Sequence, residues 1–316
     1  MVPTNDESND SFALSDRARI GRVALRVAAL DDVLPFYRDV VGLSPLGQGT
    51  DSRSTRATRG DTVDLGVERG DETADETLLV LRETPDVPAR GPAEAGLFHL
   101  AIRVPDRAAL GAVLRRAREH DVAPTGASDH LVSEALYFRD PAGNGVEVYR
   151  DRPREAWPRT DDGRVEMDTR PLDLDDLRRT AEGGESADET LPGGTDVGHV
   201  HLEVTDLDRA ESFYGDALGL RVRDRFGDAA CFLAAGDYHH HVGLNTWNGR
   251  SEPSGEHLGL DWFEFVLPDA ETLGTVRDRL RDGGYSVESV GDAVETVDPD
   301  QIRVRLTVAD TPPRDD

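Results

Sequence analysis

Gly198-His199-Val200-His201-Leu202-Glu203-Val204 is the most informative segment for the architecture, because Gly21-Arg22-Val23-Ala24-Leu25-Arg26-Val27 repeats its pattern near the start of the chain. Further pairs of residues follow both copies at matching intervals: Leu30-Asp31, Phe36-Tyr37 and Gly42-Leu43 after the first, and Leu207-Asp208, Phe213-Tyr214 and Gly219-Leu220 after the second. Internal similarity of this kind indicates duplication. Each copy predicts an alternating strand, then a helix with Phe-Tyr on its buried face, then Gly-Leu after the helix.

A weaker pair of segments follows the same plan. Residues 98–105 predict a strand before a helix over 106–120, and residues 262–268 predict a strand before a helix over 269–283. The chain is therefore expected to contain four βαβββ modules in an α+β fold, arranged as two double-module units with cupped mixed sheets. The Phe-Tyr pairs are expected to pack in the core.

The segment 128–147 reads Ser-Asp-His-Leu-Val-Ser-Glu-Ala-Leu-Tyr-Phe-Arg-Asp-Pro-Ala-Gly-Asn-Gly-Val-Glu. It resembles the signature of the extradiol ring-cleaving dioxygenases, and it departs from that signature only at Ser128. Together with the modules, it resembles the vicinal oxygen chelate superfamily, which includes glyoxalases, bleomycin-resistance proteins and extradiol dioxygenases. Within that superfamily, the chain is most similar to bacterial catechol 2,3-dioxygenase-like proteins.

The resemblance implies two vicinal oxygen chelate domains. Residues 17–152 are predicted to hold modules one and two, and residues 196–309 to hold modules three and four. Residues 153–195 are predicted to form a linker, since Gly, Glu and Ser are frequent in 181–195. The polar, acidic segments 1–16 and 310–316 are predicted to be tails.

Ligands for one divalent metal are predicted from the first and last strands of the central modules. The resemblance implies His99 and Glu147 from module two and His199 from module three, with His201 as the alternative to His199. Modules one and four offer no comparable set. This ligand set requires module two to pair with module three and module one with module four, whereas sequential pairing is the alternative topology.

The extradiol resemblance also assigns acid–base roles near the metal. In the segment 237–244, which closes module three, we expect His240 to be the catalytic histidine, with His241 as its alternative. His130 and Tyr137 match the histidine and tyrosine that hydrogen-bond a substrate oxygen. Trp247 and Arg250 are expected to border the substrate cavity.

The charge of the chain limits the classes of binding partner and the solution conditions that we expect for it. The formal net charge is −27, from 63 acidic and 36 basic residues, and every basic residue is an arginine. This predicts adaptation to high salt and disfavours nucleic acid as a partner. The single Cys231 excludes an internal disulfide, and no apolar run reaches the about 20 residues of a membrane span. We therefore expect a cytoplasmic protein, and the resemblance leaves room for a homo-oligomer.

These features predict an Fe(II)-dependent extradiol dioxygenase acting on a small aromatic diol and O2, with Mn(II) as the alternative metal. Two histidines and one carboxylate are the ligand set of non-heme Fe(II) oxygenases, and redox-inert Zn(II) could not couple substrate to oxygen. The alternatives are a glyoxalase-like metal-dependent isomerase or thiol transferase, which needs a second carboxylate ligand, and a metal-free small-molecule-binding protein of the bleomycin-resistance type.

Overall fold

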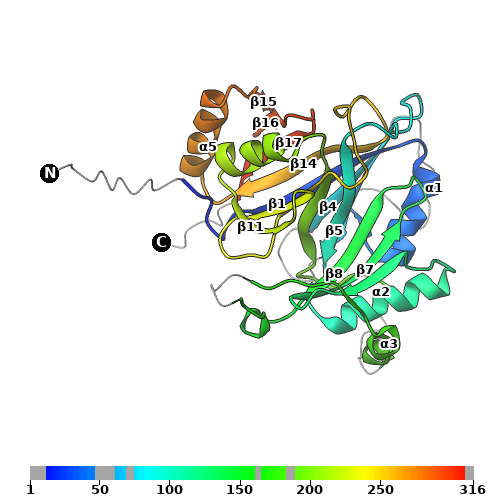
Figure 1. Ribbon diagram of the computed structural model, residues 1–316. Coiled ribbons are helices and arrows are strands. Elements are labelled where there is room, and N and C mark those ends of the chain that lie inside the picture. The colour runs from blue at the N-terminus through cyan, green and yellow to red at the C-terminus, as the bar shows by residue number, and fades with distance from the viewer. Residues whose placement is uncertain (1–11, 47–60, 69–74, 161–164, 183–188, 310–316) are drawn as a thin grey trace, which may run out of the picture.

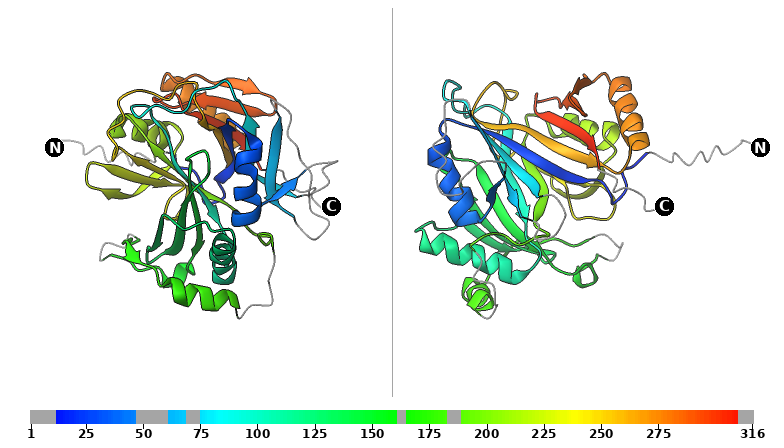
Figure 2. Two further views of the ribbon diagram at one scale, coloured as in Figure 1. Left: turned by 90° about the vertical axis from the view of Figure 1, so that its right-hand side faces the viewer. Right: turned by 180° about the vertical axis from the view of Figure 1, so that it is seen from behind.

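A computed structural model describes residues 12–46, 61–68, 75–160, 165–182 and 189–309. Two curved mixed sheets form the body of this part of the chain, and helices lie on their outer faces (Figures 1 and 2). One sheet has the strand order β15-β16-β17-β14-β1-β4-β3-β2, and the other has the order β11-β12-β13-β10-β5-β8-β7-β6-β9. The expected α+β fold with cupped mixed sheets is confirmed.

The strand bounds show how the modules are distributed between the sheets. The first sheet consists of β1 (Arg19–Val27), β2 (Ser44–Leu46), β3 (Thr62–Val67), β4 (Glu76–Glu83), β14 (Gly259–Leu267), β15 (Glu288–Val290), β16 (Ala293–Val297) and β17 (Arg303–Val308). The second consists of β5 (Gly96–Arg103), β6 (Gly126–Asp129), β7 (Ser133–Arg139), β8 (Gly145–Asp151), β9 (Arg170–Pro171), β10 (Asp196–Glu203), β11 (Arg221–Phe226), β12 (Ala230–Ala234) and β13 (Val242–Asn245).

Modules one and four therefore form the first sheet, joined by the antiparallel pair β1 and β14, and modules two and three form the second, joined by β5 and β10. This is the pairing that the predicted ligand set requires, and it differs from the sequential alternative. Each of the ranges 17–152 and 196–309 contributes one module to each sheet. These ranges describe halves of the sequence and not the two sheets, and as domain limits they stay a prediction.

The helices begin where the sequence predicts. α2 (Arg107–Glu119) follows the N-cap Asp106, whose carboxylate accepts from the Ala109 amide, and α5 (Ala270–Asp282) follows Asp269 in the same way. In modules one and three a short α-helix continues as a π-helical turn that carries Phe-Tyr. These pairs are α1 (Leu30–Pro35) with η1 (Phe36–Val41), and α4 (Leu207–Glu211) with η3 (Ser212–Ala217).

The Phe-Tyr pairs are buried in the core, as predicted. The tyrosine hydroxyl groups also form hydrogen bonds between modules that belong to different sheets. Tyr37 donates a hydrogen bond of 2.9 Å to Asp140, and Tyr214 donates one of 2.9 Å to Asp298. Asp140 also accepts from the Asn144 amide at 2.7 Å. The Asp-Pro-x-Gly-Asn turn of the signature is thus fixed, and with it the register of the β7 and β8 hairpin.

The predicted linker 153–195 is more ordered than its composition suggests. It contains the 3-10 turn η2 (Arg154–Ala156), the strand β9 and the helix α3 (Leu174–Glu182), which lies beside α2 (Figure 1). These residues are part of the folded structure, because Trp157 and Leu177 bury apolar side chains. The linker limits 153–195 stay a prediction. Residues 183–188, within the predicted break, lie outside the described residues.

The predicted tails are only partly within the structure. Leu14 is buried, and its amide donates to the Gly219 carbonyl, so this part of the predicted tail packs against module three. Residues 1–11 and the tail 310–316 lie outside the described residues. Of the helices that the structure describes, none combines the length and the apolar character needed to cross a bilayer.

Candidate metal centre and active site

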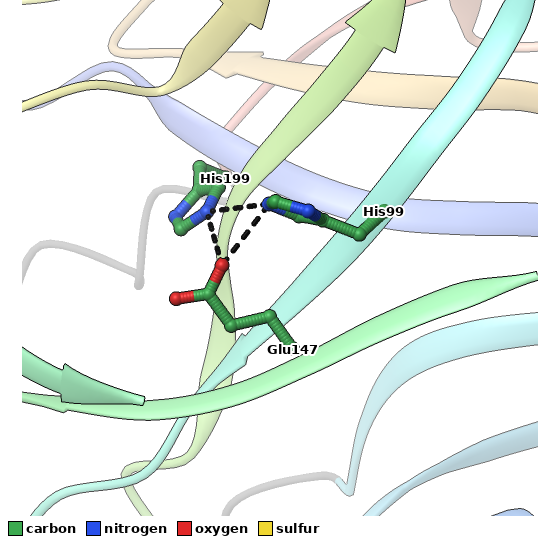
Figure 3. A group of neighbouring side chains, drawn as sticks. All are labelled: His99, Glu147 and His199. Atoms are coloured by element: carbon green, nitrogen blue, oxygen red, sulfur yellow. Dashed lines mark hydrogen bonds and ion pairs between the residues drawn. The ribbon is translucent and has the colours of Figure 1, made fainter. Parts of the chain in front are cut away.

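Three strands of the second sheet bring the predicted ligands to one point. His99 comes from β5, Glu147 from β8 and His199 from β10, and all three side chains point toward one another (Figure 3). The register explains this, because Ala101 of β5 lies opposite both Glu147 and His199. His99 is two residues before Ala101 and shares its face. The small alanine leaves the space that the three longer side chains enter.

The donor atoms form a compact triangle. His99 Nε2 lies 3.0 Å from Glu147 Oε2 and 3.3 Å from His199 Nε2, and His199 Nε2 lies 3.2 Å from the same carboxylate oxygen. Atoms bonded to one ion at about 2.1 Å are about 3.0 Å apart at right angles and about 3.4 Å apart at tetrahedral angles. The triangle therefore fits three ligands on one side of a single divalent ion.

Burial and charge favour the protonation states that a metal needs. All three side chains are buried. Burial alone would raise the pKa of Glu147, but the charge of His199 and hydrogen bonds from both histidines hold it well below its usual value. Burial lowers the pKa of His199 to about 4, against the attraction of Glu147. A carboxylate and a neutral imidazole are the forms that bind a cation.

His201 does not belong to this cluster. Among the described residues, the one group whose donor atoms converge within 4.8 Å is His99, Glu147 and His199. The His201 ring packs against Phe98, Phe232 and Trp247, with centroids 5.2 to 5.6 Å away. The geometry therefore favours His199 over His201, the alternative that the sequence left open.

The cluster lies in the wall of a cavity of about 510 Å³. That volume is within the range of small-molecule sites. The predicted residues His130, Tyr137 and His240 line the cavity, as does Trp247, and aromatic rings form much of the remaining wall. His241 does not line it. The cavity lining also lacks Arg250, whose guanidinium instead pairs with the buried Glu203 at 2.8 Å.

His130 and Tyr137 form a hydrogen-bonded pair beside the candidate metal ligands. Tyr137 of β7 lies directly across from Glu147 of β8. His130 lies in the tight connection between β6 and β7, where Leu131 has a left-handed φ of 69°. His130 Nδ1 lies 2.9 Å from the Asp168 carbonyl and Nε2 lies 2.8 Å from the Tyr137 hydroxyl. Because a carbonyl only accepts, Nδ1 donates to it, and the Tyr137 hydroxyl then donates to Nε2.

The histidine run lies in the connection between β12 and β13, and its members point to different surroundings. The His240 ring lies against the candidate ligand His199, with centroids 4.2 Å apart. His239 also lines the cavity, with Nδ1 2.8 Å from His240 Nδ1 and Nε2 3.0 Å from Asp151 Oδ1. His241 points into the core, and its Nδ1 accepts from the Ala235 amide at 3.2 Å. The structure thus brings His240 to the cavity and separates His241 from it.

Asp151 and His239 are neighbours of the site to which sequence reasoning gave no role. The signal was present for Asp151, because Glu147, Tyr149 and Asp151 alternate along one strand and so share a face. His239 is one of three adjacent histidines in a connection that has no fixed periodicity. The sequence therefore could not predict where each of these side chains points.

The corresponding positions of the first sheet hold a different set. Arg22 replaces the histidine of β10, Trp262 that of β5, and Arg305 the glutamate of β8. The Arg305 guanidinium lies 4.1 Å from the Trp262 ring centroid, and that of Arg22 lies 5.7 Å from it. Glu295 and Glu264 pair with Arg305 and Arg22. Arginine and tryptophan side chains offer no lone pair to a metal ion, and this agrees with the expectation that modules one and four supply no ligands.

We therefore predict that each chain binds one divalent ion and not two. Metal analysis after anaerobic loading with Fe(II) and removal of excess metal should give about one ion per chain, in line with the one cluster found among the described residues. A second ion retained with similar affinity would show that another site exists.

The chain matches the family model described as "Glyoxalase/Bleomycin resistance protein/Dioxygenase superfamily" over residues 19–148 and 196–304. It is 39% identical over 293 residues to a protein named catechol-2,3-dioxygenase from Bacillus subtilis (strain 168), covering 91% of this chain and 96% of that protein.

Solved structures show the same fold at low identity. A putative dioxygenase from Bacillus subtilis superimposes with a TM-score of 0.61 at 15% identity, over 95% of this chain and 87% of the other. Glyoxalase I from Zea mays superimposes with a TM-score of 0.54 at 17% identity, over 92% of each chain. With both sequence halves matched and its four modules in place, this chain belongs to the Glyoxalase/Bleomycin resistance protein/Dioxygenase superfamily.

Proposed function

We propose that the protein is an Fe(II)-dependent extradiol dioxygenase that opens catechol or a substituted catechol beside its two hydroxyl groups. The observation that carries this proposal is the buried triangle of His99, Glu147 and His199 in the wall of an aromatic cavity. Two imidazoles and one carboxylate leave coordination positions open, as non-heme Fe(II) oxygenases require. The 39% identical relative bears the name of the same activity.

Fe(II) bound by these residues would supply the electron exchange between diol and dioxygen that ring opening needs. The protein's own groups would handle the substrate and its protons. The aromatic wall from Phe98, Phe232 and Trp247 would pack against the ring. His240, against the ligand His199, is placed to take a proton from a bound hydroxyl group. Mn(II) has similar ligand preferences and is the alternative metal.

Tyr137 would assist at a second substrate oxygen. Its hydroxyl donates to His130, which leaves the oxygen lone pairs free to accept from the diol. Burial, followed by the nearby Glu147 charge, raises the pKa of Tyr137 well above its usual value. The side chain therefore stays neutral and serves as a hydrogen-bonding group, while acid–base work falls to the imidazoles.

The site disfavours the glyoxalase-like alternative. An isomerase of that type needs a second carboxylate ligand, and the cluster formed by the described residues holds one, Glu147. The metal-free binder is disfavoured by the same cluster, because buried imidazole and carboxylate groups converging without a cation are costly to desolvate.

The proposal is tested by anaerobic loading with Fe(II), followed by oxygen uptake on a panel of catechols. We expect one O2 consumed per diol, with both oxygen atoms incorporated and the ring carbon–carbon bond beside the diol broken, giving a yellow semialdehyde. Zn(II)-loaded protein is the control and should bind catechol without consuming oxygen. Catechol bound but unchanged by the Fe(II) and Mn(II) forms would support the binder, and turnover of an aldehyde substrate without oxygen uptake would support the isomerase.

A further inference from the structure

A continuous hydrogen-bonded chain leads from β8 to the cavity. Asp151, the last residue of β8, contacts His239 Nε2 at 3.0 Å, and His239 Nδ1 contacts His240 Nδ1 at 2.8 Å. His239 is 1% exposed, and its ring lies between Tyr238 and Trp157, with centroids 4.0 and 5.6 Å away. The central imidazole is therefore held in place by packing on both sides.

Asp151 is held as an ionised acceptor. Arg103 Nη1 lies 3.1 Å from its Oδ2, and the Tyr238 hydroxyl donates to the same oxygen at 2.9 Å. Burial alone would raise the pKa of Asp151, but the hydrogen bond from His239, together with the charge of Arg103, lowers it below its usual value. An ionised carboxylate can only accept, so the proton between Asp151 and His239 belongs to His239 Nε2.

This assignment determines the rest of the chain. A neutral His239 with its proton on Nε2 has a lone pair on Nδ1, and the short contact then requires His240 Nδ1 to donate. The His240 proton is thereby placed on the side that faces His239. Its Nε2 keeps a lone pair, and that nitrogen has no hydrogen-bond partner among the described residues.

We propose that Asp151 and His239 are positioning residues that hold His240 in the Nδ1–H tautomer, so that His240 Nε2 faces the bound diol as a proton acceptor. This inference rests on the proposed function and adds the groups that orient its acid–base residue. When a diol hydroxyl gives its proton to Nε2, the positive charge on His240 is stabilised through His239 by the Asp151 carboxylate. The same logic governs an Asp-His pair that orients a histidine toward a nucleophile.

Asp151→Asn is the sharpest variant, because the asparagine has nearly the same shape. Its amide can donate to His239 Nε2, which would move the His239 proton to Nδ1 and force His240 Nδ1 to accept. His240 would then present an N–H to the substrate in place of a lone pair. We expect kcat to fall about 100- to 10,000-fold with KM changed less than about threefold, since comparable Asp-to-Asn changes produce the wrong tautomer with losses up to that size.

The matched control is Asp196→Asn. Asp196 also pairs with Arg103, at 2.5 Å, but it does not contact His239. The substitution removes a carboxylate from the same arginine and leaves the relay, the hydrogen-bonded chain of Asp151, His239 and His240, intact. We expect Asp196→Asn to keep kcat within about twofold of the wild type, so that a loss confined to Asp151→Asn reports on the relay and not on Arg103.

A readout independent of turnover keeps this inference separate from the proposed function. In protein labelled with 15N-histidine and loaded with diamagnetic Zn(II), long-range 1H–15N correlations assign the tautomer of His240, with His239→Phe and His240→Ala giving the assignments. The expected result is a proton on His240 Nδ1 in the wild type, reversed or mixed in Asp151→Asn. A wild-type His240 with its proton on Nε2 would overturn the relay, whatever reaction the enzyme performs.

A second test measures the coupling between His239 and His240 with single and double variants. It can be used even if Asp151→Asn does not fold. His239→Phe preserves the ring that packs between Tyr238 and Trp157 but removes both nitrogens. If His239 acts through His240, His239→Phe should lower kcat in the wild type and have little further effect in a His240→Ala background. Equal effects in both backgrounds would contradict the relay. If the tautomers were as expected but neither the wild type nor any variant cleaved the ring, the proposed reaction would be rejected and the hydrogen-bonded chain would stand.

Discussion

Glu147→Ala is expected to lose both bound iron and ring cleavage. The substitution removes the one anionic member of the triad and leaves two imidazole nitrogens 3.3 Å apart. Since loss of a group that only supports a ligand already costs about 10- to 100-fold in metal affinity, loss of the ligand should cost more than about 100-fold. Iron content after desalting and oxygen uptake with catechol measure the two effects, and they should fall together.

The first sheet supplies a matched control for this variant. Glu264 of β14 is also a buried strand glutamate, but it pairs with Arg22 at 2.9 Å on the side that holds no metal cluster among the described residues. Glu264→Ala should lower the free energy of unfolding and still retain about one iron per chain. If Glu147→Ala kept both iron and turnover, the assignment of the triad would be wrong, even with the fold unchanged.

The convergence of His99, Glu147 and His199 could be predicted because each residue belongs to a strand with a known partner. The repeat beginning at Gly198 places His199 on the first strand of its module, and the Asp-Pro-x-Gly-Asn turn fixes Glu147 on the last strand of another. Strand pairing has a period of two, so position along the sequence determines which face a side chain takes. The need for His99, Glu147 and His199 to share one ion then favoured the non-sequential pairing of modules, which the sheet order shows.

The features that could not be predicted lie outside strands, where side chains do not alternate with a period of two residues. Three consecutive histidines in the connection between β12 and β13 have the same local sequence signal, and only tertiary packing sends His240 to the cavity and His241 to the core. The segment 153–195 was predicted to be a linker from the Gly- and Glu-rich break at 181–195, which does not reveal buried side chains such as Trp157 and Leu177. The average composition of a segment does not show the effect of a few buried apolar side chains.

His240→Ala is expected to lower kcat about 100- to 10,000-fold while iron remains bound. His240 is not a member of the metal cluster, but it lines the cavity and lies 4.2 Å, centroid to centroid, from the ligand His199. Burial, followed by the charges of His199 and His239, lowers its pKa well below the usual value. The imidazole is therefore neutral before substrate binds and can accept a proton. Steady-state oxygen uptake with catechol, normalised to iron content, measures the loss.

His241→Ala is the comparator that separates position from residue type. Burial lowers the pKa of His241 to about 3, so this neighbour is also a neutral, buried imidazole, but it accepts a core amide hydrogen bond and does not line the cavity. Its removal leaves the Ala235 amide unpaired and should cost about 1–3 kcal/mol of stability, with kcat per iron within about twofold of the wild type. Since the two residues are adjacent and chemically identical, only their direction can produce different outcomes. A large kcat loss in His241→Ala with little effect in His240→Ala would transfer the acid–base role to the residue that the sequence held as the alternative.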